Sequence, residues 1–133
     1  MRIATWHNDR AVEQMTEWGI TEGSVKSMLE TGSHRGWLCE IKDRVVGFSM
    51  GNRENGEMWV VAVLKEFEAM GIGRELMSLV EGWLWSQGWS EIWLTTDPDE
   101  LVRAVGFYRA IGWRDWKIEG SRYMRRFRPE QVG

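Results

Sequence analysis

The most constraining feature of this chain is an almost entirely apolar run that leads, through two closely spaced glycines, into a long amphipathic segment. The run spans residues 58–64, with the sequence "MWVVAVL", and the glycines are Gly71 and Gly73. Apolar residues then recur with helical periodicity at Ile72, Leu76, Leu79, Val80, Trp83 and Leu84. We therefore expect a strand that is buried on both faces and central in a sheet, followed by a glycine loop and a helix.

The segments on either side of this unit predict further strands. Residues 36–64 read as three consecutive strands, because residues 42–44 form a short polar connection and Asn55-Gly56 is a strong hairpin turn signal. Residues 91–96 predict another strand, and residues 113–127 predict a terminal hairpin that turns at Gly120.

Helices are predicted at residues 8–18, 21–30 and 97–112 from their caps and apolar spacing. The last of these is expected to open at Asp97-Pro98 and to close at Gly112. Together the elements predict one α/β (α+β) domain over residues 1–133, with a single mixed, mostly antiparallel central sheet flanked by helices.

The composition fits such a domain and narrows the classes of function. Of the 133 residues, 43% are hydrophobic and 28% are charged, which indicates a globular chain. The sequence has no apolar run of membrane-spanning length and no signal-peptide pattern, so we expect a cytoplasmic protein without a membrane partner. The single cysteine, Cys39, cannot form an internal disulfide, and His7 and His34 provide no ligand cluster, so no metal is expected.

The net charge of −3 hides an asymmetry along the chain. Residues 1–102 carry 17 acidic and 9 basic side chains, whereas residues 103–133 carry 3 acidic and 8 basic ones. The basic segment "SRYMRRFR" could contact nucleic acid, but a final strand with a solvated basic face is the commoner cause of such a pattern. Because the rest of the chain is acidic and would be repelled by phosphate backbones, we expect no nucleic-acid partner.

Ten tryptophans are present in the chain. Trp59, Trp83, Trp93 and Trp113 stand beside apolar neighbours, which predicts that they fill the core. This composition also leaves open a tryptophan-rich interaction module without a cofactor.

The glycines between the buried strand and the helix suit a loop that binds an anion. A helix N-terminus presents unpaired N–H groups and a positive dipole end, and glycine lets a phosphate approach the backbone closely. A P-loop is excluded because no Gly-Lys-Ser/Thr follows, and a dinucleotide fingerprint is excluded because Leu76 stands where a third glycine is needed. By itself, Gly71-Ile72-Gly73 is also explained by a tight turn.

Two motifs at a characteristic separation carry a family resemblance. The first is a buried strand that leads into Arg/Gln-x-x-Gly-x-Gly/Ala at a helix start, matched by Gly71 and Gly73. The second is Ala-x-x-Phe-Tyr-x-x-x-Gly-aromatic, matched at Ala104, Phe107, Tyr108, Gly112 and Trp113. Both motifs, and the order of elements from about Trp37 onward, resemble the GNAT superfamily of N-acetyltransferases.

The resemblance implies that acetyl-CoA is the co-substrate and that an acetyl group passes to a primary amine of a small molecule or protein. In the family, the strand that corresponds to Val61, Ala62 and Val63 pairs with the pantetheine arm. The pyrophosphate would be held by the N–H groups of Glu68, Ala69, Met70, Gly71, Ile72, Gly73 and Arg74.

The resemblance also implies two catalytic residues. Tyr108 occupies the position of the tyrosine that protonates the departing thiolate. Glu57 lies fourteen residues before Gly71, the position of the general base in some members. A carboxylate there could remove a proton from the attacking amine. Glu57 could equally be a solvated strand residue, and Tyr108 could be part of the core.

The chain departs from the family pattern in the phosphate loop. Glu68 stands in place of the usual arginine or glutamine, and Met70 stands where a basic residue is common. Since a carboxylate about 4 Å from a phosphate would cost on the order of 1–4 kcal/mol, Glu68 is expected to point away or to weaken CoA binding. Lys65 and Arg74 could restore positive charge nearby.

These departures leave a second interpretation open, namely a noncatalytic CoA-binding or regulatory domain. The acceptor is not specified by the sequence. The acidic side chains at Glu13, Glu17 and Glu22 could favour a cationic amine, although a solvated helix face explains them too. The sequence is also compatible with a homodimer.

Overall fold

A seven-stranded sheet forms the centre of the protein in the computed structural model, which describes residues 1–6, 28–99 and 103–129. The strand order is β1-β2-β3-β4-β5-β7-β6. The strands are β1 (Arg2–Thr5), β2 (His34–Ile41), β3 (Arg44–Asn52), β4 (Glu57–Val63), β5 (Glu91–Thr96), β6 (Arg114–Glu119) and β7 (Ser121–Phe127). All neighbouring strands are antiparallel except β4 and β5, so the predicted single mixed, mostly antiparallel sheet is confirmed.

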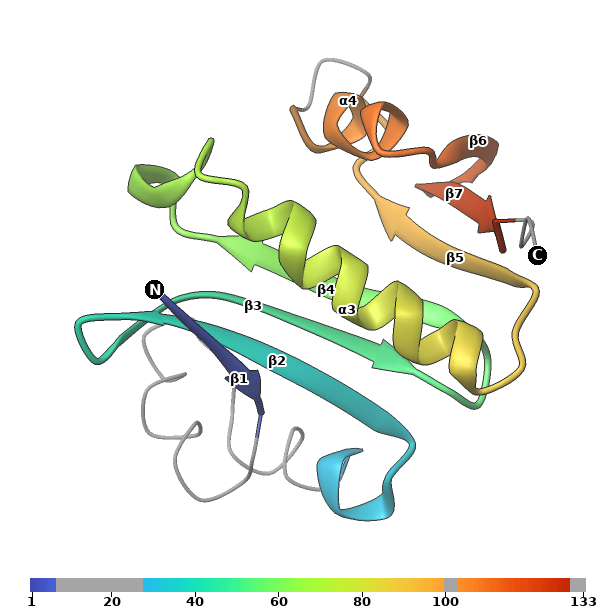
Figure 1. Ribbon diagram of the computed structural model, residues 1–133. Coiled ribbons are helices and arrows are strands. Elements are labelled where there is room, and N and C mark those ends of the chain that lie inside the picture. The colour runs from blue at the N-terminus through green and yellow to red at the C-terminus, as the bar shows by residue number, and fades with distance from the viewer. Residues whose placement is uncertain (7–27, 100–102, 130–133) are drawn as a thin grey trace.

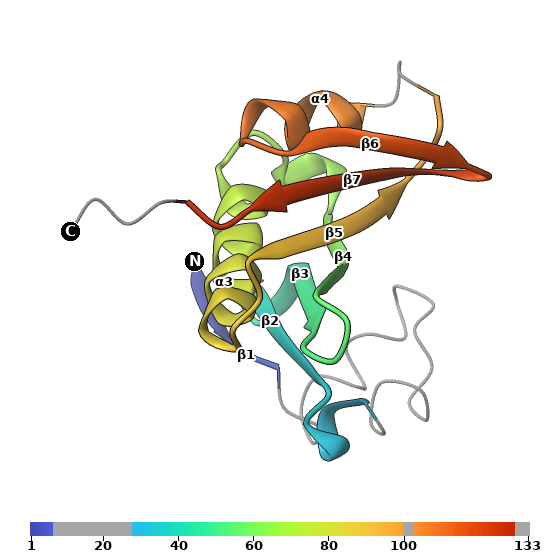
Figure 2. The same cartoon turned by 90° about the vertical axis from the view of Figure 1, so that its right-hand side faces the viewer.

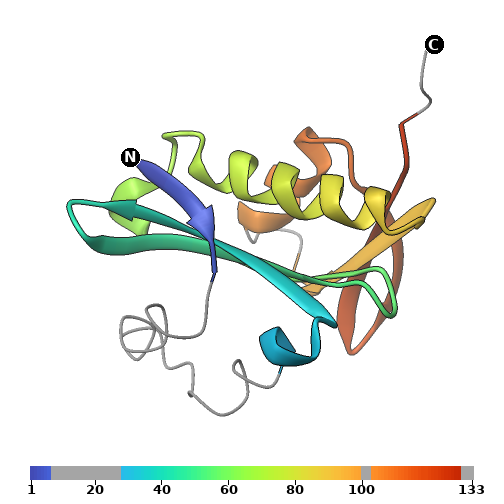
Figure 3. The same ribbon diagram turned by 60° about the horizontal axis from the view of Figure 1, so that its bottom comes forward.

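Two helices and a short 3₁₀ turn complete the described elements. The turn η2 (Lys65–Phe67) and helix α3 (Ile72–Ser86) follow β4, and helix α4 (Arg103–Ala110) follows β5. Figure 3 shows α3 lying across one face of the sheet, and Figures 1 and 2 show α4 beside β6 and β7. The helices predicted within residues 8–18 and 21–27 lie outside the described residues, while residues 28–31 are helical.

The hairpins form where the sequence predicts them. Lys42 and Asp43 connect β2 to β3 with positive φ angles of 52° and 63°, and Gly56 precedes β4 with a φ of 75°. A two-residue connection with positive φ at both positions matches the twist of the flanking strands. Gly120 turns the terminal hairpin between β6 and β7 with a φ of 76°.

Helix α3 holds the main core against the sheet. Its buried side chains are Ile72, Leu76, Met77, Val80, Glu81 and Leu84. Ile72 and Leu76 pack against side chains of β2, β3 and β4, whereas Met77, Val80 and Leu84 belong to a cluster that includes side chains of β4, β5, α4 and β7. The buried Ser49 hydroxyl of β3 donates a hydrogen bond to the Leu76 carbonyl at 3.1 Å, which satisfies a polar group under the helix.

Three expectations about burial and boundaries need correction. Strand β4 is central in the sheet, but Met58 is its one fully buried residue, and β3 is the strand that is buried over most of its length. Trp59 is 38% exposed and does not fill the core, because a bulge makes it an extra residue between the pairs of Val60 with Met50 and of Met58 with Gly51. Residues 97–99 are not helical, so α4 does not open at Asp97-Pro98.

Candidate active site

Strands β4 and β5 separate soon after they meet. Glu57 at the start of β4 pairs with Trp93, and the Trp93 N–H donates to the Gly56 carbonyl at 3.2 Å. No further pair joins β4 to β5 within the described residues. The two arrows diverge in Figure 1, with α4 beyond the opening. The remainder of β4 therefore keeps an edge that β5 does not cover, and an extended ligand can hydrogen-bond to such an edge.

The loop between η2 and α3 presents backbone amides at the same end of the opening. Gly71 is the N-cap of α3, with a φ of 81° and no capping hydrogen bond from a side chain. The Glu75 N–H donates to the Gly71 carbonyl at 3.1 Å and so begins the helical ladder. The preceding N–H groups have no place in that ladder, and the positive end of the helix dipole lies among them. This geometry suits an anion.

A groove of about 460 Å³ connects these features. It is lined by Val61, Ala62, Val63, Phe67, Glu68, Ala69, Gly71, Ile72, Gly73, Arg74, Arg103, Ala104, Phe107, Ala110 and Ile111. Nine of the ten predicted cofactor-binding residues are in this set, and the exception is Met70, which is 56% exposed and outside the groove. The groove thus runs from the free edge of β4, past the start of α3, to one side of α4.

The two glycines of the loop have different roles. A Cβ atom at Gly73 would lie 3.6 Å from both Phe107 and Val63, so a larger side chain would extend into the space between β4 and α4. At Gly71 a Cβ would meet nothing within 4 Å, but the φ of 81° is one that other residues adopt only with strain. The two glycines therefore serve different purposes, one steric and one conformational.

The carboxylate of Glu68 is engaged by a cation from another element. Arg103 Nη1 at the start of α4 donates a hydrogen bond to Glu68 Oε2 at 2.8 Å. The sequence predicts Lys65 and Arg74 as the compensating charges. Arg74 lines the groove, but Lys65 does not, and Arg103 is the cation that contacts Glu68.

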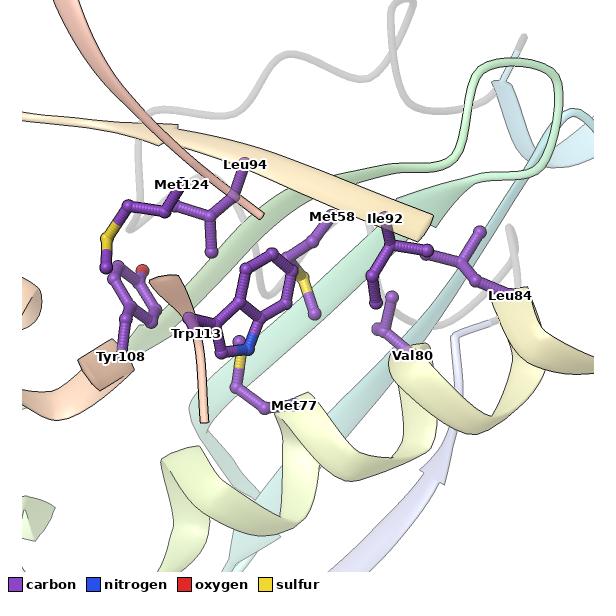
Figure 4. Packing of buried hydrophobic residues seen from close by; sticks show 9 residues of the cluster. All are labelled: Met58, Met77, Val80, Leu84, Ile92, Leu94, Tyr108, Trp113 and Met124. Carbon is purple, nitrogen blue, oxygen red and sulfur yellow. The ribbon is translucent and has the colours of Figure 1, made fainter. Parts of the chain in front are cut away.

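Tyr108 lies beside the groove rather than in its lining. It is 9% exposed and belongs to the core cluster with Met58, Met77, Leu94, Trp113 and Met124, as Figure 4 shows. Its neighbour on α4, Phe107, does line the groove, with ring centroids 5.6 Å apart. Burial raises the pKa of the Tyr108 phenol above its ordinary value. The phenol is therefore a protonated donor at neutral pH.

Glu57 lies at the point where β4 and β5 part. Its neighbour Met58 packs into the cluster under α3, so strand alternation places Glu57 on the opposite face of the sheet. The side chain is partly buried, and burial raises the pKa of its carboxyl above the ordinary range. Its backbone N–H donates to Asn55 Oδ1 at 3.0 Å, which supports the turn before the strand.

The structure brings together a buried polar cluster that sequence reasoning missed. Glu81 Oε2 on α3 accepts hydrogen bonds from Trp113 Nε1 at 3.1 Å and from Arg126 Nη1 at 2.8 Å. Arg126 also donates to the Ile111 carbonyl at 2.9 Å. The available signal was a glutamate on the apolar stripe of α3, between Val80 and Leu84. The cluster ties α3, the end of α4 and β7 together.

Comparison with known proteins identifies the family. The Acetyltransferase (GNAT) family profile matches residues 3–113. This match covers most of the chain, so the protein belongs to the GNAT acetyltransferase family. The fold agrees, since an aminoglycoside 6′-N-acetyltransferase crystallised with coenzyme A superposes with a TM-score of 0.77, 16% identity, and coverage of 98% of this chain and 100% of that one.

Two curated relatives share part of their length with this chain. An N-acetyltransferase of Methanocaldococcus jannaschii is 31% identical over 84 residues, 62% of this chain and 54% of that protein. Mycothiol acetyltransferase of Kocuria rhizophila is 29% identical over 127 residues, 84% of this chain and 42% of that protein. The chain thus spans about half the length of the curated relatives it matches.

Two further features are absent from the part of the chain that the structure describes. None of its helices is both long and apolar enough to cross a membrane. No three His, Cys, Asp or Glu side chains come together there as metal ligands.

Proposed function

We propose that this protein is an acetyl-CoA-dependent N-acetyltransferase that transfers an acetyl group to a primary amine of a small molecule or a protein by direct attack on the thioester. The observation that carries the proposal is the groove. It joins the amide-rich start of α3 to the free edge of β4 and to the helix that contains Tyr108.

The binding part of the proposal rests on the two ends of this groove. The loop amides and the α3 dipole would hold the pyrophosphate, because N–H groups at a helix start bind phosphate oxygens. The edge of β4 at Val61, Ala62 and Val63 would hydrogen-bond the pantetheine arm in the manner of an added strand. Coenzyme A bound to the structural neighbour described above supports this assignment.

The chemical part assigns one proton transfer to each of two residues. Acetyl-CoA supplies an activated acetyl thioester, and the amine must be neutral before it can attack. Glu57, on the sheet face opposite α3 and beside the β4–β5 junction, would accept the amine proton directly or through a water. Tyr108 would donate its phenolic proton to the departing thiolate, and its raised pKa keeps that proton in place until it is needed.

Two measurements test the proposal. Calorimetry with acetyl-CoA and with CoA should give saturable heat, and both ligands should raise the melting temperature. A thiol-release assay over a panel of primary amines should then identify an acceptor with a rate above that of acetyl-CoA alone.

The outcomes separate the competing interpretations. Absence of binding to either ligand would reject every cofactor-dependent function and favour a tryptophan-rich interaction module. Binding without thiol release for any small amine or amino-terminal peptide would favour a noncatalytic CoA-binding domain, in agreement with the burial of Tyr108.

A further inference from the structure

An ion pair crosses the mouth of the groove. Glu68 belongs to the loop before α3 and Arg103 to the first turn of α4, 35 residues later, yet their side chains are 2.8 Å apart. Both residues line the groove. Their side chains are 36% and 75% exposed, respectively, so the pair faces solvent on one side and the groove on the other.

The ion pair reduces the repulsion that the Glu68 carboxylate would exert on a bound diphosphate. A carboxylate among amides that bind a diphosphate would repel the ligand, since two like charges about 4 Å apart interact by roughly 1–4 kcal/mol at the dielectric of a partly solvated site. Contact with Arg103 neutralises that charge and holds it toward α4. The carboxylate in turn fixes a flexible arginine at one position over the groove.

The guanidinium keeps donors available for a second partner. Arginine carries five N–H donors in a planar fork, and the hydrogen bond to Glu68 uses Nη1. A guanidinium that shares one edge with a carboxylate can still present other N–H groups to a phosphate. Arg74 lines the same groove, so cations from two different elements, α3 and α4, are available to an anionic ligand there.

We propose that Arg103 is a diphosphate-binding residue of this protein and that Glu68 is the residue that positions it. This inference rests on the proposed function, because it assumes that CoA occupies the groove. It assigns to α4 the positive charge that the loop lacks. Glu68 then positions Arg103 and does not weaken phosphate binding.

The test measures CoA affinity by calorimetry in a set of variants. Arg103→Ala should weaken CoA binding by about tenfold or more, because a charge-assisted hydrogen bond is lost and the Glu68 carboxylate is left unpaired beside the phosphates. The double variant Arg103→Ala with Glu68→Gln should recover part of that loss, since no unpaired charge remains. Arg103→Lys should fall between the wild type and Arg103→Ala.

The matched control is another arginine of the same helix. Arg109 donates to Asp115 Oδ1 at 3.1 Å in an exposed ion pair and does not line the groove. Arg109→Ala should leave the CoA affinity unchanged. Melting temperatures of all variants, measured without ligand, should be close to that of the wild type, because exposed ion pairs contribute about 0–1 kcal/mol.

Dephospho-CoA, which lacks the 3′-phosphate, identifies the phosphate that Arg103 contacts. If Arg103→Ala weakens dephospho-CoA as much as CoA, the diphosphate is the partner. If the loss disappears with dephospho-CoA, the assignment to the diphosphate is overturned. Equal CoA affinities of Arg103→Ala and wild type would overturn the inference while leaving the proposed function intact, whereas a wild type that binds no CoA would reject the proposed function itself.

Discussion

The indole N–H of Trp113 donates a hydrogen bond to the carboxylate of Glu81 at 3.1 Å, inside the core that α3 and the α4–β6 connection share. Arg126 contacts the same carboxylate oxygen at 2.8 Å. A charge in this place is tolerated because both neighbours donate to it. The position of the α4–β6 connection relative to α3 thus depends on a polar contact as well as on apolar packing.

Replacement of Glu81 should destabilise the fold more than replacement of an exposed glutamate on the same helix. Glu81→Ala leaves Trp113 Nε1 without an acceptor and removes the counter-charge of the partly buried Arg126, which keeps only the Ile111 carbonyl, so we expect the free energy of unfolding to fall by about 2–4 kcal/mol. Glu75→Ala, at an exposed position in the first turn, should cost less than about 1 kcal/mol. Urea unfolding at pH 7 measures both.

The same carboxyl should make stability depend on pH. Burial raises the pKa of Glu81 above its value in the unfolded chain, although Arg126 opposes the shift. The folded state therefore holds this proton more tightly. The part of the stability that comes from this bound proton is fully present below the unfolded pKa and is lost as the pH rises through the folded pKa, whereas the hydrogen bonds from Trp113 and Arg126 remain. The difference in unfolding free energy between wild type and Glu81→Gln should change in that direction across this window, and a constant difference would contradict the assignment.

Tyr108→Phe should slow acetyl transfer without preventing CoA binding. Loss of a general acid typically lowers kcat by about 10²-fold or more, and the ring that packs in the core is retained. The other tyrosine of the chain, Tyr123, stacks on Trp93 in β5 and provides a matched control. Tyr123→Phe should change kcat far less. Equal rates for wild type and Tyr108→Phe would show that the phenol is not the general acid.

Glu57→Gln should alter the pH dependence of the reaction. If the carboxylate is the base, kcat/KM of the wild type rises as the pH passes through the Glu57 pKa, which burial raises above the ordinary range of glutamate. The Gln variant should lose about 10²-fold in kcat/KM and should lack this acidic limb. Glu54→Gln, an exposed change in the same hairpin, is the control. If the pH profile of kcat/KM for Glu57→Gln parallels that of the wild type, a group other than Glu57 is responsible for the acidic limb.

Gly73→Val should block the groove without unfolding the protein. The added methyl groups would start from a Cβ already 3.6 Å from Val63 and Phe107, where the pantetheine arm is expected, so CoA affinity should fall by about tenfold or more. Gly82→Ala, on the same helix with open space around its Cβ, should keep CoA affinity and raise stability by about 0.5–1 kcal/mol. Calorimetry and thermal melting measure both changes. Unchanged affinity in Gly73→Val would place the ligand elsewhere.

The elements themselves could be predicted from the sequence because their signals are local. Helix α3 follows from apolar residues at i, i+3 and i+4, and the β3–β4 hairpin follows from Asn55-Gly56. The predicted start of α4 at Asp97-Pro98 was wrong because Asp97 has the residue type of an N-cap. Its Oδ1 instead accepts a hydrogen bond from the Asp99 N–H in a turn that precedes the helix.

The exposure of β4 could not be predicted from its composition. An apolar run is compatible with burial by neighbouring strands or with an open ligand groove, and the separation of β4 from β5 decides between them. Phe107 and Tyr108 present a similar case. The motif contains both residues. The packing of α4 places Phe107 in the groove lining and Tyr108 in the core beside the groove.

By itself, the sequence determined strands β2 to β7, helix α3 and the glycine loop, since each depends on residues that are close together in the chain. The tertiary structure alone decided that Arg103 meets Glu68 across 35 residues and that Arg126 meets Glu81 across 45. Such contacts depend on which strands pair and how closely two helices approach. No local pattern encodes how closely these side chains approach, and the first contact sets the charge of the candidate cofactor groove, because Glu68 and Arg103 both line it.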